Sequence, residues 1–303
     1  MKIRFGLIGT GYWATTVHGA SVTRHPGVDL VGVWGRDATK TSDAANELGT
    51  RPYADVDTLL ADVDALTFAV PPDVQAEIAT RAAKGGRHLL LEKPVATSVA
   101  GAARLEKAVA EAQVGSIVFF TRRFVPETQA WLRHLDDQGG WDCGRIEFAA
   151  NVQDGPFGSS PWRHEKGGLW DVGPHALSIL LPVLGDVTSV IAGAGRGDQV
   201  HLVMAHPAGG SSTASLSLTV PQAGTGTTMY FYGESGREAA SASPLGTDGV
   251  ISAHQAAIDA LIGQIEQPGS GHACDVHFGV RVVEILAAAQ QSLTTGCRVD
   301  TPR

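Results

Sequence analysis

Cysteine is scarce in this chain of 303 residues, with only Cys143, Cys274 and Cys297 present. These positions are far apart and show no paired spacing, whereas zinc sites usually have closely spaced pairs of cysteines and a disulfide framework is dense in them. The pattern therefore argues against a disulfide scaffold and a structural zinc ion. It fits a reducing compartment, and we expect a cytoplasmic protein with no metal site.

Basic charge and long apolar segments are also lacking. The chain has 23 Lys and Arg against 31 Asp and Glu, which gives a net charge of -8 and a pI of about 5.7. Such a balance does not attract a phosphate backbone, so nucleic acid is not an expected partner. No apolar run reaches the roughly 20 residues that span a bilayer, and the N-terminal residues do not resemble a secretory signal. We expect no membrane association.

The first third of the chain alternates short apolar runs with helix-length segments. The runs predict strands at residues 3–8, 28–35, 65–71, 87–92 and 116–121. The intervening segments predict helices, among them 14–24, a helix capped by Asp73 that ends at Ala83, and 98–112. Strands separated by helices imply a parallel sheet with right-handed crossovers, which is the Rossmann type of α/β fold.

A glycine-rich turn follows the first predicted strand in the segment "IRFGLIGTGYWA". Gly9, Gly11 and Ala14 match the G-x-G-x-x-G/A pattern of dinucleotide-binding sites. Gly9 permits the tight turn, Gly11 lets a pyrophosphate approach the backbone, and Ala14 lets the next helix pack closely. The N-terminus of that helix offers free N–H groups to phosphate oxygens. The strand before the turn and the helix after it favour this interpretation over a simple tight turn.

The end of the second predicted strand bears on the choice of dinucleotide. An NAD site usually has an acid about 20 residues after the glycines, but the residues here are Trp34, Gly35 and Arg36. A guanidinium can hold a 2′-phosphate with paired hydrogen bonds, so Arg36, with Thr39 or Lys40, favours NADP. The alternative is that Arg36 is solvated and Asp37 turns back to the ribose.

Glu92 and Lys93 follow three leucines at the end of the strand predicted at 87–92 and precede Pro94. Ligands of parallel sheets bind beyond the carboxyl ends of the strands, so this pair is expected at the same edge as the glycine turn. A lysine there can polarise a carbonyl oxygen and donate a proton to it while the cofactor supplies hydride. The alternative is a surface ion pair of little consequence.

The second half of the chain has a different pattern. Several runs with alternating polarity predict strands at 145–153, 187–194, 199–206, 212–220 and 227–233, which favour a mostly antiparallel sheet. Residues 251–267 and 275–293 predict amphipathic helices, and residues 236–249 a loop. We therefore divide the chain into a dinucleotide-binding Rossmann domain (1–122) and an α+β domain for substrate binding and oligomerisation (123–303).

Three segments in order resemble the glucose–fructose oxidoreductase, inositol dehydrogenase and rhizopine-catabolism family (Gfo/Idh/MocA). They are the glycine turn, the Glu92-Lys93-Pro94 motif, and "WRHEKGGLWDVGPHALSIL", in which Asp171-x-Gly173-x-His175 resembles the family's D-x-G-x-H signature. The segment "RRFVP" (122–126) and the final helix are also similar to the family, so the resemblance covers nearly the whole chain.

The resemblance implies an NAD- or NADP-dependent oxidoreductase that acts on sugars, cyclitols or related hydroxy and keto compounds. It implies that Lys93 transfers the proton, that His175 lies beside the reacting carbon, and that the Lys93–Pro94 peptide is cis. It also implies a homodimer or homotetramer packed through the second sheet. Two departures affect the substrate: family members that act on sugars often have Asp at the position of Ser178, and often Asn at that of Thr121.

The predicted site residues follow from these motifs together. Lys93, His175 and Asp171 are the expected catalytic residues, and substrate binding is assigned to these three with Arg122 and Arg163. Arg163 either holds the cofactor or an acidic substrate group, or lies in a surface loop with Trp162. The predicted cofactor-binding residues are Gly9, Thr10, Gly11, Tyr12, Trp13, Arg36, Pro71, Pro72, Glu92, Lys93, Trp162 and Arg163.

Two other functions stay open at this point. One is chemistry like that of dihydrodiol dehydrogenase on a less polar substrate, which the loss of an acid at Ser178 allows. The other is a dinucleotide-binding metabolite sensor without turnover. The presence of both Lys93 and His175 favours an enzyme over the sensor.

Overall fold

The structure is a computed structural model that describes residues 2–152, 154–241 and 245–302. The chain divides into two compact units, one formed by residues 1–125 and 245–280 and the other by 126–244 and 281–303. The C-terminal half therefore contributes a segment to the first unit. The predicted domain boundary after residue 122 stays a prediction.

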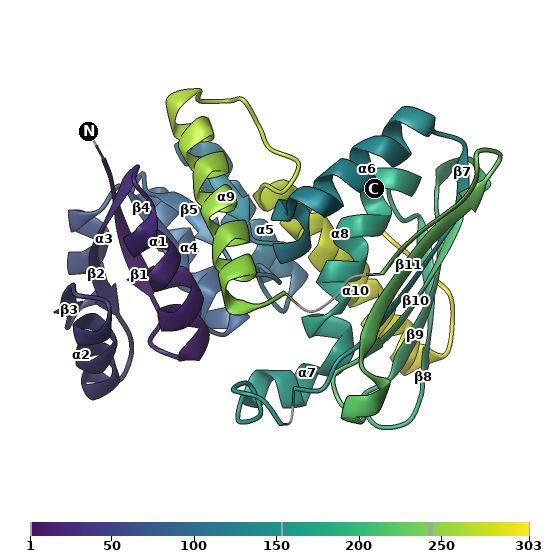
Figure 1. Cartoon of the computed structure of the whole chain (residues 1–303), viewed down its shortest axis with the longest axis horizontal. Coiled ribbons are helices and arrows are strands. Elements are labelled where there is room, and N and C mark those ends of the chain that lie inside the picture. The colour runs from purple at the N-terminus through teal and green to yellow at the C-terminus, as the bar shows by residue number, and fades with distance from the viewer. Residues whose placement is uncertain (1, 153, 242–244, 303) are drawn as a thin grey trace. The chain divides into compact units, whose positions relative to one another are not determined.

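The first unit contains a parallel sheet of six strands in the order β3-β2-β1-β4-β5-β6 (Figure 1). This order is that of a doubly wound dinucleotide-binding fold, and the predicted Rossmann class is confirmed. The strands are β1 (Ile3–Ile8), β2 (Val28–Trp34), β3 (Arg51–Tyr53), β4 (Ala65–Phe68), β5 (His88–Leu91) and β6 (Ser116–Val118). The middle strands β1, β4 and β5 are apolar along nearly their whole length because helices cover both faces.

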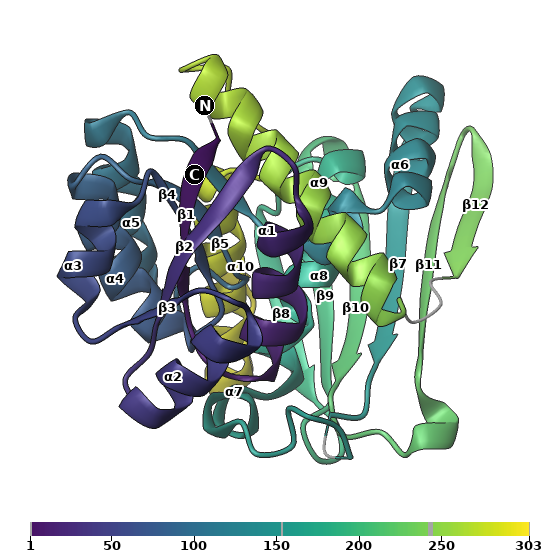
Figure 2. The same ribbon diagram turned by 60° about the vertical axis from the view of Figure 1, so that its left-hand side comes forward.

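The helices of this unit occupy both faces of the sheet. In Figure 2, α1 lies beside α9, and α4 packs against α5 on the other face. The segments are the π-helix η1 (Ala14–Gly19), α1 (Ala20–Arg24), α2 (Ala38–Glu47), α3 (Val56–Asp62), α4 (Pro72–Lys84), α5 (Val99–Ala112), the 3₁₀ turn η2 (Thr121–Phe124) and α9 (Thr247–Glu266). Ser98 caps α5 through a hydrogen bond from Gly101 N.

Two local predictions need correction. Asp73 was expected to cap α4, but the N-cap is Pro71, and the carboxylate of Asp73 instead accepts hydrogen bonds from Thr97. The helix predicted at 14–24 is present, but it begins as the π-helix η1 and becomes α-helical at Ala20. Such wide turns occur often at functional sites.

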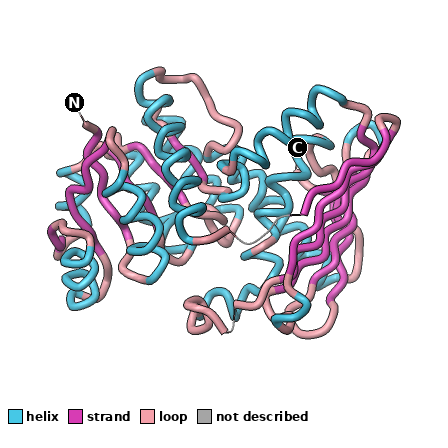
Figure 3. Tube along the Cα trace, in the orientation of Figure 1, coloured by secondary structure: helices cyan, strands magenta, loops and turns pink. Residues whose placement is uncertain are grey.

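The second unit contains a sheet of seven strands in the order β12-β11-β7-β10-β9-β8-β13, drawn in magenta on the right of Figure 3. All neighbouring pairs are antiparallel except β7 and β10. The predicted mostly antiparallel sheet is therefore confirmed. The strands are β7 (Trp141–Ala149), β8 (Ser189–Ala194), β9 (Val200–Ala205), β10 (Ser211–Ser217), β11 (Gly226–Gly233), β12 (Gly236–Ser241) and β13 (Val299–Asp300).

Helices pack on one face of this sheet. They are α6 (Pro126–Gln138), α7 (Pro161–Asp171), α8 (Gly173–Leu184) and the C-terminal part of α10 (Val276–Thr295), with short 3₁₀ turns η3 (Pro207–Gly209) and η4 (Gln222–Gly224). The loop expected at 236–249 is wrong in part, because 236–241 form β12 in a hairpin with β11. Its residues 242–244 lie outside the described residues. None of the described helices combines the length and apolar character needed to cross a membrane.

Candidate functional site

The glycine turn lies where β1 ends, against the start of the segment after β4. Gly9 has a φ of +132°, and a Cβ built on it would lie 2.4 Å from the carbonyl oxygen of Ala69. Only glycine fits this position without displacing backbone. A Cβ on Gly11, in contrast, would meet nothing within 4 Å. The backbone at Gly11 therefore faces open space, as a pyrophosphate-binding turn requires.

A cleft of about 580 Å³ opens beside this turn. Its lining includes five of the predicted cofactor-binding residues, namely Gly9, Thr10, Gly11, Arg36 and Pro71, together with Trp34, Gly35, Asp37, Lys40, Ala69, Val70 and Val74. The space and its glycine floor fit the adenosine diphosphate half of a dinucleotide. Of the other predicted residues of this region, Tyr12 is half exposed and Pro72 is buried at the start of α4.

Arg36 and Asp37 have different environments at the far end of the cleft. Arg36 is exposed and lines the cleft with Lys40. Asp37 is the N-cap of α2, and its Oδ1 accepts a hydrogen bond from Lys40 N at 3.0 Å. The carboxylate is thus held at the helix start, where the dipole also favours it.

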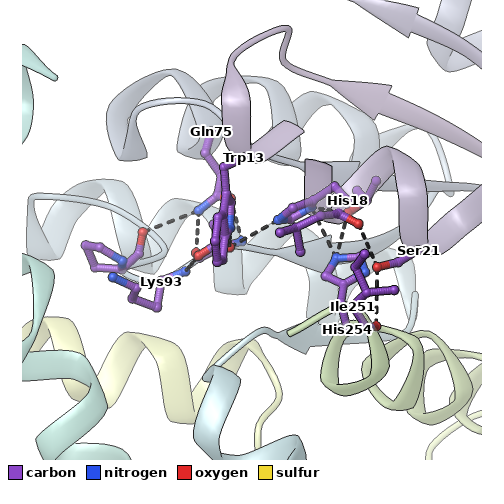
Figure 4. A network of polar contacts seen from close by, with 11 residues as sticks. Trp13, His18, Ser21, Gln75, Lys93, Ile251 and His254 are labelled. Atoms are coloured by element: carbon purple, nitrogen blue, oxygen red, sulfur yellow. Dashed lines mark hydrogen bonds and ion pairs between the residues drawn. The ribbon is translucent and has the colours of Figure 1, made fainter. Parts of the chain in front are cut away.

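Glu92 lies just beyond the end of β5 and is fixed by contacts to both its backbone and its carboxylate. Figure 4 labels three residues that contact it, namely Trp13, Gln75 and Lys93. The buried side chain of Gln75 donates to Glu92 O at 2.7 Å and accepts from Glu92 N at 2.8 Å. Trp13 Nε1 donates to Glu92 Oε1 at 2.7 Å, which joins the glycine turn to the end of β5. Lys93 N donates to Glu92 Oε2 at 3.1 Å.

Lys93 is half-buried, and it is followed by the buried Pro94. The Lys93–Pro94 peptide is cis, as the family resemblance implied. The surface ion pair considered as the alternative for Glu92 does not describe this environment, because the Glu92 side chain is only 13% exposed.

In the second unit, Asp171 ends α7 and His175 lies in the first turn of α8. Asp171 is buried, and its Oδ2 accepts a hydrogen bond from Arg163 Nε at 3.1 Å. The guanidinium of Arg163 also lies over the rings of Trp162 and Phe157. Arg163 is therefore held by a buried acid and two aromatic rings, which is not the environment of a residue in a solvated loop.

The imidazole of His175 stacks on Phe148 at a centroid distance of 5.6 Å. Ser178 stands at the position where family members that act on sugars often have Asp. Its hydroxyl donates a hydrogen bond to His175 O at 2.8 Å. Arg122 lies in η2 of the first unit, and burial lowers the pKa of its guanidinium. The roles predicted for all these residues stay predictions.

Sequence reasoning missed three polar residues around Glu92: Gln75, His18 and His254. His18 Nε2 lies 3.1 Å from Glu92 Oε1, and His254 Nε2 lies 3.2 Å from His18 Nδ1. Each of the three residues is fully buried on the packed side of a helix. The sequence signal that could have identified these residues is a polar side chain at a helix position that the pattern predicts to be apolar.

Comparison with known proteins relates this chain to oxidoreductases. Residues 3–120 match the model of an oxidoreductase family with an NAD-binding Rossmann fold. An uncharacterized oxidoreductase of Synechocystis sp. is 29% identical over 264 residues, which cover 78% of this chain and 70% of that protein. The inositol 2-dehydrogenase of Rhizobium meliloti is 29% identical over 138 residues, or 45% of this chain and 42% of its own length.

Among solved structures, GenD2 from gentamicin A biosynthesis, in complex with NAD, superposes with a TM-score of 0.88. The superposition covers 100% of this chain and 97% of that one, at 22% sequence identity. At this identity the likeness shows the fold alone. It extends over both sheets, beyond the residues that the family model matches.

Proposed function

Because this chain is a member of the Gfo/Idh/MocA family of oxidoreductases, we propose that it transfers hydride between NADP(H) and a carbohydrate-like alcohol or ketone. One observation carries the proposal: Trp13 of the glycine turn is hydrogen-bonded to Glu92, the neighbour of Lys93. The cofactor motif and the proposed proton donor thus belong to one edge of one sheet.

The surroundings of the adenosine half support NADP over NAD. An NAD site usually has an acid that binds the ribose hydroxyls, and the candidate acid here, Asp37, caps α2 through its Oδ1. Arg36 and Lys40 line the same end of the cleft and supply positive charge for a 2′-phosphate. Solvent exposure leaves the guanidinium of Arg36 able to reorient toward such a group.

Lys93 acts at the oxygen of the reacting carbon. The bound nicotinamide supplies or accepts the hydride. In reduction, the Lys93 ammonium polarises the carbonyl and gives a proton from Nζ to the developing alkoxide. In oxidation, neutral Nζ takes that proton from the hydroxyl. The buried Pro94 and the two hydrogen bonds between Gln75 and the Glu92 backbone hold the chain from which the Lys93 side chain extends.

His175 assists by hydrogen bonding to the substrate, and Asp171 and Arg163 help to bind it. The buried pairing of Asp171 with Arg163 supports a fixed arrangement of these side chains before substrate arrives. Arg122 is a further substrate-binding residue, because a guanidinium can donate hydrogen bonds to an anionic or polar substrate group. The similarity to inositol 2-dehydrogenase supports a polyhydroxylated substrate.

The outer face of the second sheet supports a homodimer or homotetramer. Ile191 and Val203 are direct cross-strand neighbours and are 48% and 53% exposed, and Tyr232 is 51% exposed. Tyr232 lies on β11, apart from the other two in the strand order, and exposed large apolar side chains on an open sheet are typical of protein interfaces. The cytoplasmic location stays a prediction.

The decisive experiment has two parts. Purified protein is titrated with NADPH and NADH by fluorescence, and we expect tight binding of NADPH only. It is then assayed by cofactor absorbance against a panel of sugars, cyclitols and diols. Turnover of a sugar or cyclitol supports the proposal, and turnover of the apolar diols alone would replace its substrate class. Cofactor binding without turnover of any compound would favour a sensor.

A further inference from the structure

A cluster of three buried polar side chains lies directly behind Glu92. His18, Thr67 and His254 come from η1, β4 and α9, and each is 0% exposed. Phe119 closes one side of the cluster, with ring centroids 6.3 Å from His18 and 4.8 Å from His254. Burying polar groups in such surroundings is costly unless they are fully hydrogen-bonded, so the cluster needs an explanation.

His18 connects this cluster to the carboxylate, as Figure 4 shows. Its Nε2 lies 3.1 Å from Glu92 Oε1. On the other side of the ring, Nδ1 lies 2.6 Å from Thr67 Oγ1 and 3.2 Å from His254 Nε2. The imidazole of His18 therefore links the buried side chains of Thr67 and His254 to the carboxylate of Glu92.

The direction of these hydrogen bonds follows from His254. Complete burial and the neighbouring His18 hold the pKa of His254 well below its usual value, so this ring is neutral. Its Nδ1 has no hydrogen-bond partner among the described residues. Since buried donors are more consistently paired than buried acceptors, the proton belongs on Nε2, which faces His18 Nδ1 and Thr67 Oγ1.

His18 Nδ1 is then an acceptor, and the proton of a neutral His18 lies on Nε2 and points at Glu92. Glu92 Oε1 thus receives hydrogen bonds from both His18 and Trp13, and Oε2 receives one from Lys93 N. Three donors aimed at one carboxyl group fix its orientation. No proton on His18 or His254 is left without an acceptor in this arrangement.

The position of Glu92 determines what its charge does. In a doubly wound sheet the half built on β1, β2 and β3 takes the adenosine, and the half built on β4, β5 and β6 takes the nicotinamide. Arg36 and Lys40 line the cleft in the first half, and Glu92 follows β5 in the second. A fixed anion on that side stabilises the positive charge of an oxidised nicotinamide ring more than the neutral reduced ring.

We propose that His18 is a positioning residue which, supported by Thr67 and His254, keeps the Glu92 carboxylate oriented toward the nicotinamide and so favours binding of the oxidised cofactor. The inference rests on the proposed function for the identity of the ligand. It assigns to three buried residues outside the cofactor cleft a part in setting the redox preference of the site.

The test measures the dissociation constants of NADP⁺ and NADPH by calorimetry for the full-length protein and its variants. His18→Phe keeps the ring volume but removes the donor to Glu92, so we expect the affinity for NADP⁺ relative to NADPH to fall about tenfold. His18→Gln retains a side-chain N–H, and we expect it to recover most of that ratio. Glu92→Gln should lower the ratio at least as much as His18→Phe, and the double variant no further, because both changes act on one carboxylate.

Ser21→Ala is the matched control. The Ser21 hydroxyl is also fully buried and joins the same elements, since it donates to Val17 O at 2.6 Å and Ile251 O at 3.3 Å. Neither of these hydrogen bonds involves Glu92, so removing the Ser21 hydroxyl should leave the ratio of NADP⁺ to NADPH affinity unchanged. If His18→Phe and Ser21→Ala give the same ratio as wild type, the proposal is wrong.

Two further measurements keep the result decisive. If His18→Phe does not fold, Thr67→Val replaces it, since this substitution removes the hydroxyl with little change of shape.

In wild-type protein with ¹⁵N-labelled imidazoles, NMR should find His18 protonated at Nε2, and protonation at Nδ1 alone would overturn the proposal. Altered cofactor ratios without turnover of any substrate would contradict the oxidoreductase reaction but uphold the role of His18. Wild-type protein that binds neither cofactor form would refute both.

Discussion

The carboxylate of Asp37 accepts a hydrogen bond from the backbone N–H of Lys40 at 3.0 Å and thereby caps α2. An acid at this end of a dinucleotide cleft would ordinarily bind a ribose hydroxyl and repel a 2′-phosphate. Asp37 is exposed and lines the cleft together with Arg36 and Lys40. The two basic side chains support the proposed contact with a 2′-phosphate.

Replacing Arg36 tests this arrangement directly. Arg36→Ala should weaken NADPH binding about ten- to hundredfold, because a charge-assisted contact to the 2′-phosphate is lost, and leave NADH binding nearly unchanged. Fluorescence titration of both cofactors measures the effect. Arg104→Ala, at an exposed arginine of α5 outside the cleft lining, is the control. Equal losses for NADPH and NADH would show that Arg36 does not recognise the 2′-phosphate.

Lys93→Met should separate binding from chemistry. Methionine keeps much of the side-chain length but cannot hold a proton, so we expect kcat to fall by about a hundredfold or more, in the range of general acid–base catalysis. The cofactor dissociation constant should change little. Steady-state assays and cofactor titrations on the same preparation provide both numbers. Lys107→Met, at a largely exposed lysine of α5, controls for loss of charge. Substantial activity in Lys93→Met would exclude this lysine as the proton donor.

The buried pair of Arg163 and Asp171 predicts a difference in stability. Asp171→Asn removes the negative charge that balances a guanidinium only 19% exposed, and should lower the free energy of unfolding by about 1–3 kcal/mol. Asp29→Asn breaks the exposed pair with Lys2 and should cost at most about 1 kcal/mol. Urea denaturation measures the free energy of unfolding of both variants. Equal losses would mean that the buried Arg163–Asp171 pair stabilises the protein no more than the exposed pair does.

Most of the first unit was predictable because its signals are local and agree with one another. The apolar runs of β1, β4 and β5 are bounded by glycine, proline and charged residues, so period and length both indicate buried parallel strands. The short strand β3 and the edge strand β12 were missed. Arg51-Pro52-Tyr53 and Gly236-Arg237-Glu238 carry little apolar pattern, since edge strands have fewer neighbours to pack against.

The candidate site was predictable where it consists of motif residues, and not where it depends on tertiary contacts. Glu92 and Lys93 stand out in the sequence, but nothing near them in the chain names their partners. Gln75 and His18 lie 17 and 74 positions from Glu92 in the sequence and contact it only through folding. Helix α9 was predicted as an amphipathic element, but amphipathicity does not say which unit it joins.

Buried histidines predict a loss of stability in mild acid. Burial lowers the pKa of His254, and also those of His88, His206 and His272. Below the ordinary histidine pKa of about 6.5 the unfolded chain takes up protons that the folded chain refuses, so the free energy of unfolding falls as the pH falls, by up to about 1.4 kcal/mol per pH unit for each such group.

The His254→Phe variant should therefore show a shallower dependence of stability on pH between about 6.5 and 5 than wild type, whatever its absolute stability. Denaturation in urea at several pH values gives the slope. The exposed control is His134→Gln, which should keep the wild-type slope. An unchanged slope in His254→Phe would indicate that this imidazole titrates in the folded protein as it does in the unfolded chain.

Two glycines of the same turn should respond in opposite ways to the same substitution. Gly9→Ala places a methyl group 2.4 Å from Ala69 O at a φ of +132°, so the backbone must shift. We expect a loss of about 2 kcal/mol or more in unfolding free energy. Gly11→Ala meets nothing within 4 Å, and the protein should unfold as wild type does. Its methyl group, however, stands in the space where a pyrophosphate would approach the backbone, so cofactor affinity should fall. A stable Gly11→Ala protein with undiminished affinity would mean that the dinucleotide does not cross this turn.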